Sequence, residues 1–246
     1  RIKGKDAILA PFFQGQDASA TPPNAFKAGA LLGKMNKLSE NYPHRQPQPW
    51  GVTALREKRS HVDEHNLSDA QKESLTAFDR VFTWDGKAVN QSAPSHLPKG
   101  VVHSDFFPDN ILFKDGNISA VIDFYKAGCD ALAFDLAMRL SAWGFDNDGH
   151  FLKDVYQNFY KGYTSVRSLT PNEQAAMPQL FTRACATIIL MRILRAQILK
   201  KPVLGASQAE KHNADAQTPE GVRPPTAYLA RLNFLHNNNF QSLLHD

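Results

Sequence analysis

The 246-residue chain has little of several features that mark whole classes of protein. It contains only two cysteines, Cys129 and Cys185, which lie far apart and have no metal-ligand spacing, so a cysteine-based metal site and a disulfide scaffold are excluded. Two cysteines are enough in number to form one disulfide bond. We expect instead two free, buried thiols in a reducing compartment.

Long uncharged apolar runs and charge of one sign are also scarce. The longest apolar run, at about 184–199, is interrupted by Arg192 and Arg195, which favours a core helix over a membrane span. No signal-peptide pattern opens the chain, so we expect a cytoplasmic protein without a membrane partner. The 28 basic and 24 acidic residues leave a dispersed net charge of +4, which does not predict a nucleic-acid groove.

The order of predicted strands and helices along the chain indicates an α+β fold dominated by helix. The apolar run at residues 6–13 predicts a strand, and residues 41–66, rich in Pro, His and Arg, predict a long surface segment. Apolar spacing and capping residues predict helices at about 21–38, 68–82, 131–143, 150–163, 170–200 and after 225.

A β-hairpin is predicted in the middle of the chain. Two β-rich runs, at residues 111–113 and 118–122, flank a turn at 114–117 that contains Asp-Gly and Gly-Asn. These pairs are typical of tight hairpin turns.

The segment before this hairpin, His103 to Asn110, has the pattern H-x-D-x-x-x-x-N of kinase catalytic loops. Phosphoryl transfer needs a carboxylate that accepts the proton of the attacking hydroxyl, and oxygen ligands that hold Mg²⁺ against the phosphates. Asp105 is therefore the predicted base, and the amide oxygen of Asn110, five residues later, is a predicted magnesium ligand.

A second magnesium ligand is predicted at Asp123, which ends the second hairpin strand and so returns to the loop. We read His103 and Asp135 as support for the site: His103 would orient the loop, and Asp135 would accept backbone N–H groups. Taken singly, Asp105, Asn110 and Asp123 would be ordinary loop or turn caps. Their order and context favour the catalytic interpretation.

Residues 103–113 (HSDFFPDNILF) and 121–137 (VIDFYKAGCDALAFDLA) resemble the aminoglycoside-phosphotransferase-like kinases. Within that family, the sequence of these segments is most similar to the group that phosphorylates L-homoserine. The resemblance implies a protein-kinase-like fold, here mainly the helical C-terminal lobe, with ATP and Mg²⁺ as cofactors and a small hydroxyl compound as substrate.

The resemblance also implies an adenine site in the segment that joins the two kinase lobes. Residues 9–15 (LAPFFQG) resemble this hinge, with the carbonyl of Pro11 and the N–H of Phe13 facing adenine. Residues 1–16 would then be the end of the small lobe and the hinge, and residues 17–246 the substrate-binding and catalytic lobe. The family's phosphate-covering loop and lysine have no counterpart before this hinge, so we expect a fragment that binds ATP poorly by itself.

The acceptor pocket is left open by the sequence. A substrate with a carboxylate calls for arginine, and four arginines lie on the predicted helices: Arg139, Arg183, Arg192 and Arg195. Asp130 and Asp146 are candidate partners for an amine. Three hypotheses stay open: a homoserine kinase, a kinase for another amino-alcohol or an aminoglycoside, and a non-catalytic kinase-like module.

Overall fold

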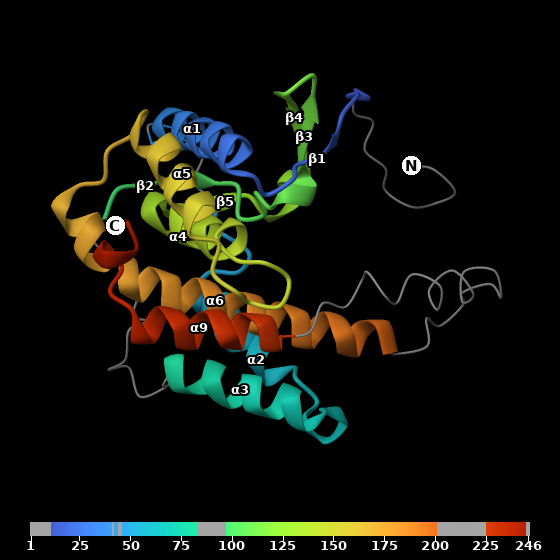
Figure 1. Cartoon of the computed structure of the whole chain (residues 1–246). Coiled ribbons are helices and arrows are strands. Elements are labelled where there is room, and N and C mark those ends of the chain that lie inside the picture. The colour runs from blue at the N-terminus through green and yellow to red at the C-terminus, as the bar shows by residue number, and fades with distance from the viewer. Residues whose placement is uncertain (1–10, 41, 44–45, 83–96, 201–224, 245–246) are drawn as a thin grey trace.

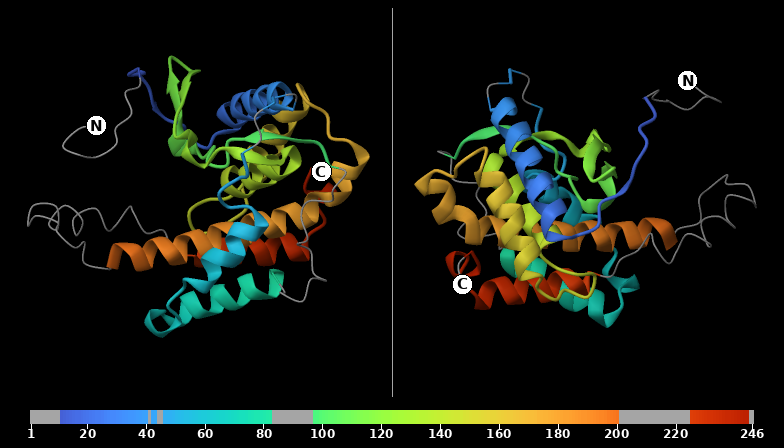
Figure 2. Two further views of the ribbon diagram at one scale, coloured as in Figure 1. Left: turned by 180° about the vertical axis from the view of Figure 1, so that it is seen from behind. Right: turned by 45° about the horizontal axis from the view of Figure 1, so that its top comes forward.

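The computed structural model describes residues 11–40, 42–43, 46–82, 97–200 and 225–244. Its helices are stacked in layers, with a small strand-rich part projecting at one end (Figure 1). From one side to the other lie the pair α1 and α5, then α4, then the pair α6 and α9, and finally α3, with α2 against α6 (Figures 1 and 2). The bounds are α1 Pro22–Ser39, α2 Val52–Ser60, α3 Asp69–Val81, α4 Leu132–Trp143, α5 Lys153–Thr164, α6 Pro171–Lys200 and α9 Thr226–Asn237.

The backbones of α1 and α5 touch because a glycine faces each contact. A Cβ atom on Gly162 would lie 2.1 Å from the carbonyl oxygen of Phe26, and one on Gly29 would lie 2.1 Å from that of Phe159. Glycine costs about 1 kcal/mol in a helix relative to alanine. The close approach of the two helices explains why glycine occurs at both positions.

Helix α6 is the central element of the helical body. Its start is held by a capping box: the Thr170 hydroxyl accepts from the N–H of Glu173, whose carboxylate accepts from the N–H of Thr170 and pairs with Arg167. The segment Pro171–Ile198 is long and apolar enough to cross a membrane, but 67% of its most apolar window is buried in the molecule. That burial is what a core helix requires.

The strands form two small antiparallel sheets that flank the catalytic-loop sequence. The first has the order β1-β3-β4, with bounds Gln16–Asp17, Ile111–Lys114 and Asn117–Val121. Between β3 and β4, Asp115 and Gly116 both have positive φ, 50° and 71°, as a two-residue hairpin turn requires. The second sheet pairs β2 (Lys99–Val102) with β5 (Gly128–Ala131).

Most predicted elements are confirmed, including every predicted helix and the hairpin, and both cysteines are free. The prediction that both thiols are buried is wrong for Cys129, which is partly exposed.

Two predicted segments differ. The supposed surface excursion contains α2, which buries Leu55 and is tied to α3 by a bidentate bond from Arg59 to Asp79. The strand predicted at 6–13 is wrong at residues 11–13, where Phe12 is 90% exposed, and residues 6–10 lie outside the described ranges. The strand that forms, β1, is only residues 16–17, and the predicted lobe boundary falls inside it.

Candidate active site

The predicted catalytic loop runs from the end of β2 to the start of β3 and folds back on itself. The N–H of Asp105 donates to Nδ1 of His103 (3.1 Å), and the N–H of Phe107 donates to the carbonyl of Asp105 (2.8 Å). The side-chain amide of Asn110 donates to the same carbonyl at 2.7 Å and to Oδ2 of Asp105 at 3.2 Å. The loop therefore places Asn110 directly beside the carboxylate of Asp105.

His103 connects this loop to the end of β4. Because its Nδ1 accepts from Asp105, the ring proton is on Nε2, which donates to the carbonyl of Ile122 at 3.1 Å. Burial, with a further contribution from the positive charge of Arg139, lowers the pKa of His103 to about 4. The ring is neutral at pH 7 and joins the two segments that carry the predicted base and metal ligands.

Asp135 lies beneath the loop on α4 and is almost wholly buried. Its carboxylate accepts from the backbone N–H groups of His103 (3.2 Å) and Ser104 (3.4 Å). Burial raises the pKa of Asp135, and the Arg139 guanidinium, whose Nε lies 3.7 Å from Oδ1, opposes that rise. The guanidinium also stacks on the ring of Phe107, 4.6 Å from its centroid, so α4 holds the loop from below.

Asp123 follows β4 in the left-handed backbone conformation, with φ 64° and ψ 63°. This turn brings its side chain toward Asp105. Burial raises the pKa of Asp123, and the neighbouring charge of Asp105 raises it further. Its Oδ1 is buried and has no hydrogen-bond partner among the described residues.

A buried carboxylate oxygen without a partner, next to a second carboxylate and an amide oxygen, fits a hard divalent cation. Asp123 and Asn110 are thus suited to hold Mg²⁺, and the backbone brings the two predicted ligands and Asp105 to one place. Their assigned roles remain predictions.

Lys126 is a member of this site that sequence reasoning missed. It ends the single 3₁₀ turn Phe124–Lys126 after Asp123, and its Nζ lies 2.9 Å from Oδ1 and 3.0 Å from Oδ2 of Asp105. Its position three residues after Asp123 was the only available signal, and lysines are common on loops for other reasons.

These side chains open into a cavity of about 600 Å³ between the loop and α6. One wall is polar and contains the predicted catalytic and metal-binding residues with Lys126. The facing wall comes from the C-terminal half of α6 and carries two arginines among apolar side chains. The lining consists of Trp50, Asp105, Phe107, Asp109, Asn110, Asp123, Lys126, Ile188, Met191, Arg192, Leu194, Arg195 and Ile198.

Two of the four candidate arginines line the cavity, and two do not. Arg192 and Arg195 line the cavity, whereas Arg139 is buried beneath the loop. Arg183 forms a bidentate pair with Asp130 and stacks on Phe134, so the suggestion that Asp130 binds a substrate amine is not supported.

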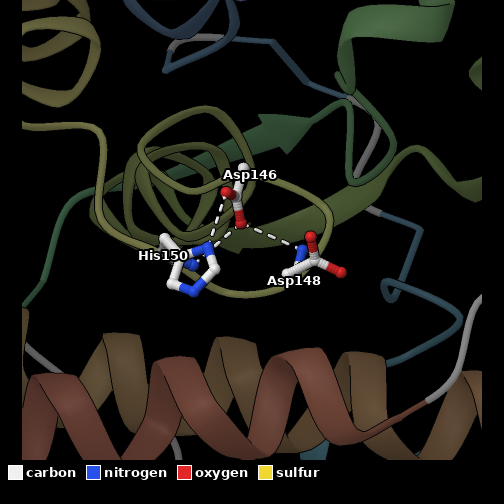
Figure 3. A group of neighbouring side chains, drawn as sticks. All are labelled: Asp146, Asp148 and His150. Atoms are coloured by element: carbon white, nitrogen blue, oxygen red, sulfur yellow. Dashed lines mark hydrogen bonds and ion pairs between the residues drawn. The ribbon is translucent and has the colours of Figure 1, made fainter.

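Asp146, the other candidate amine partner, organises a turn instead (Figure 3). Its carboxylate accepts from the backbone N–H groups of Asp148 (2.9 Å) and His150 (2.8 Å), and from Nδ1 of His150 (2.8 Å). These bonds lower the pKa of Asp146 and raise that of His150. The three groups are close enough to share a metal ion, but the turn already accounts for their arrangement.

Pro11 and Phe13, the predicted adenine contacts, lie in an extended exposed segment before β1. Neither lines the cavity described above. Their role remains a prediction from the family resemblance.

Comparison with known proteins agrees with this geometry. The Phosphotransferase enzyme family (APH) matches residues 1–169. A homoserine kinase of Zymomonas mobilis is 35% identical over 203 residues, 78% of this chain and 59% of the relative, and one of Granulibacter bethesdensis is 38% identical over 77% of this chain and 58% of the relative. One of Gluconobacter oxydans is 30% identical over 99% of this chain and 70% of its own length. The chain thus spans about three fifths of the first relatives it matches.

Solved structures show the same fold at low identity. An amicoumacin kinase, solved with AMP-PNP and Ca²⁺, superposes with a TM-score of 0.55 at 19% identity, over 88% of this chain and 65% of that one. A putative aminoglycoside phosphotransferase of Ralstonia eutropha gives 0.53 at 13% identity, over 93% and 72%. The predicted α+β, kinase-like fold is confirmed. From the catalytic-loop geometry and the match over residues 1–169, this chain belongs to the phosphotransferase enzyme family.

Proposed function

We propose that this chain forms the catalytic and acceptor-binding part of a kinase that transfers the γ-phosphate of ATP to the hydroxyl of L-homoserine. The observation that carries the proposal is the convergence of Asp105, Asn110 and Asp123 on one cavity. Relatives named homoserine kinase, at 30% to 38% identity, support the choice of acceptor.

In this mechanism Asp105 is the base. The side-chain amide of Asn110 donates to the Asp105 carboxylate, and His103 accepts from the backbone N–H of Asp105. The carboxylate held in this way accepts the proton of the bound hydroxyl as the hydroxyl oxygen attacks the γ-phosphorus. The bond from phosphorus to the β–γ bridging oxygen breaks, and its electron pair leaves with ADP. Asn110 and Asp123 would hold Mg²⁺, which would supply positive charge against the phosphates.

The α6 wall of the cavity favours an acceptor that carries a carboxylate. Arg192 lies there with its guanidinium carbon 4.5 Å from the ring centroid of Tyr228, and Arg195 is one turn further along. Guanidinium groups recognise carboxylates through paired hydrogen bonds. Homoserine offers that carboxylate, whereas choline and aminoglycosides are cationic and would meet like charge on this wall. Asp109, which lines the loop side of the cavity, would pair with the amine.

A cytoplasmic location is a further part of the proposal. Two more parts rest on the family resemblance: Pro11 and Phe13 bind adenine, and residues 1–16 and 17–246 belong to different lobes. Loss of ATP affinity in a variant with Phe13→Pro, which removes the N–H that would face adenine, tests the first of these.

The test of the function is phosphorylation by the complete gene product, followed as ADP release and as O-phosphohomoserine. We expect turnover with L-homoserine and Mg²⁺, and little with choline, ethanolamine or kanamycin. Preference for one of these cationic acceptors would replace homoserine with the second hypothesis. ATP binding without transfer to any hydroxyl would support a non-catalytic module. The 246-residue chain is assayed in parallel and is expected to be the weaker catalyst.

A further inference from the structure

Among the cations of the described residues, Lys126 is the one that forms a salt bridge with the predicted base, Asp105. Its ammonium bridges both carboxylate oxygens of Asp105, at 2.9 and 3.0 Å. The carboxylate is 8% exposed and the lysine side chain 31% exposed. The contact is thus anchored on a fixed, buried acid, while the lysine reaches it from the open cavity.

The surroundings show why a cation is needed there. Asp105 and Asp123 line the same cavity, so two carboxylates lie together at the place where the phosphoryl group would enter. Arg139, the other cation near Asp105, lies beneath the loop on Asp135 and Phe107. Lys126 lies instead on the cavity side, where Asn110 and Asp123 also point. It is therefore the cation placed between the base and any group that enters the cavity.

An acceptor hydroxyl can reach Asp105 only if one carboxylate oxygen is shared or released by Lys126. The lysine stem is flexible, so the ammonium can shift without a change in the backbone. The transferring phosphoryl group carries negative charge on three oxygens and must come in line with the same hydroxyl. An ammonium displaced from one oxygen of Asp105 meets that group at the point of transfer.

We propose that Lys126 is a positioning and charge-stabilising residue for phosphoryl transfer: its ammonium holds Asp105 toward the acceptor hydroxyl and bridges from this carboxylate to the transferred phosphoryl group. The inference rests on the proposed kinase function but does not depend on which alcohol is the acceptor. In the step itself the hydroxyl proton moves to Asp105, the acceptor oxygen bonds to the γ-phosphorus, and ADP leaves with the electrons of the broken bond. Lys126 stays protonated throughout.

The experiment compares Lys126→Met, Lys126→Arg and wild type in the complete gene product. The lysine acts in the transition state, so Lys126→Met should lower kcat about 100-fold and change KM for the acceptor less than about three-fold. Lys126→Arg keeps the charge and should recover at least a tenth of wild-type kcat. In Lys126→Ala, added ethylamine should restore activity in a saturable way. Lys161→Met, an exposed lysine on α5, is the matched control and should match wild type.

A second measurement separates this role from a merely structural ion pair. Binding of AMP-PNP with Mg²⁺, measured by calorimetry, should weaken about five-fold in Lys126→Met and remain unchanged in Lys161→Met. A Lys126→Met protein with kcat within three-fold of wild type and unchanged nucleotide binding overturns the inference. Lost activity that neither arginine nor ethylamine restores also overturns it.

Another result would contradict the proposed function and not the role of Lys126. Wild-type turnover of another alcohol in place of homoserine contradicts the acceptor assignment, and the Lys126 comparison is then made with that alcohol. Absence of nucleotide binding in the wild-type protein contradicts both.

Discussion

Asn110, Lys126 and His103 each restrict Asp105 in a different way. Asn110 and Lys126 bond its side chain, while His103 holds its backbone N–H. If Asp105 is the base, a carboxylate held in this way accepts a proton from the open side of the cavity. The loop sequence alone predicted the base and its neighbour Asn110, but not the cation that lies on it.

Replacement of Asp105 with Asn is expected to lower kcat by about 10²- to 10⁴-fold, because the amide has nearly the same shape but cannot accept the hydroxyl proton. Initial rates with homoserine and ATP measure the effect. Asp115→Asn in the hairpin turn is the matched control, since Asn tolerates the positive φ found there. A kcat within three-fold of wild type would mean that Asp105 is not the base.

Arg192 can be tested by comparing an acceptor that carries a carboxylate with one that lacks it. Arg192→Met should raise KM for L-homoserine about 10- to 100-fold, the value of a charge-assisted hydrogen bond of roughly 1.5–3 kcal/mol. It should leave the slow reaction of 3-aminopropan-1-ol, which differs from homoserine only in lacking the carboxylate, nearly unchanged. Arg80→Met, which removes an exposed arginine of α3, is the control. Equal effects on both alcohols would show that Arg192 does not bind the carboxylate.

Among the described secondary-structure elements, α1 and α5 approach each other so closely that a Cβ atom has no room at Gly162. Gly162→Ala should destabilise the protein by about 2 kcal/mol or more, although alanine is the better helix former, because its Cβ would overlap the carbonyl of Phe26. Urea unfolding measures the change, and Lys161→Ala on the exposed face of α5 should stay within about 0.5 kcal/mol of wild type. A stabilised Gly162→Ala protein would show that the two helices separate easily.

Elements with strong local signals could be predicted from the sequence, and elements defined by a distant partner could not. The predicted helices at 68–82 and 170–200 start at capping boxes of Ser68 and Thr170, and the predicted turn forms at Asp115-Gly116. Each depends on residues within four positions. Strand β5, with the sequence GCDA, has no β-rich pattern and exists through its pairing with β2. Helix α2 lacks an apolar face and is held by the bonds of Arg59 to α3.

The same distinction applies to the candidate site. Residues on one loop and its hairpin were predicted together because chain geometry forces them to converge. The arginines that line the cavity could not be predicted, because the sequence shows four arginines on helices. Only packing decides which of them face the cavity. Arg183 and Arg139 face inward to Asp130 and Asp135, which leaves Arg192 and Arg195 on the wall.

At the scale of the whole molecule, the site joins the strand-rich end to the helical body. The loop is held from below by Asp135 on α4, from the side by the carbonyl of Ile122 after β4, and faces α6 across the cavity. The hairpin and α4 must therefore be in place for the predicted base and metal ligands to meet, and α6 supplies the facing wall of the cavity. The buried ring of His103 makes this arrangement depend on pH.

Stability should fall as the pH is lowered from about 6.5 to about 4, and His103 should account for much of that fall. In the unfolded chain its pKa is near 6.5, whereas in the folded protein it is about 4, so the unfolded state binds more protons over this range. Stability from the neutral ring is complete above pH 6.5 and is lost on acidification, by about 3 kcal/mol at pH 4. Urea unfolding of wild type and His103→Gln at pH 7 and pH 4 measures it. Carboxylates such as Asp135 titrate in both proteins, so the difference between the two isolates His103. The stability difference between the proteins should shrink by about that amount at pH 4, and equal pH dependence in both would show that folding does not lower the pKa of His103.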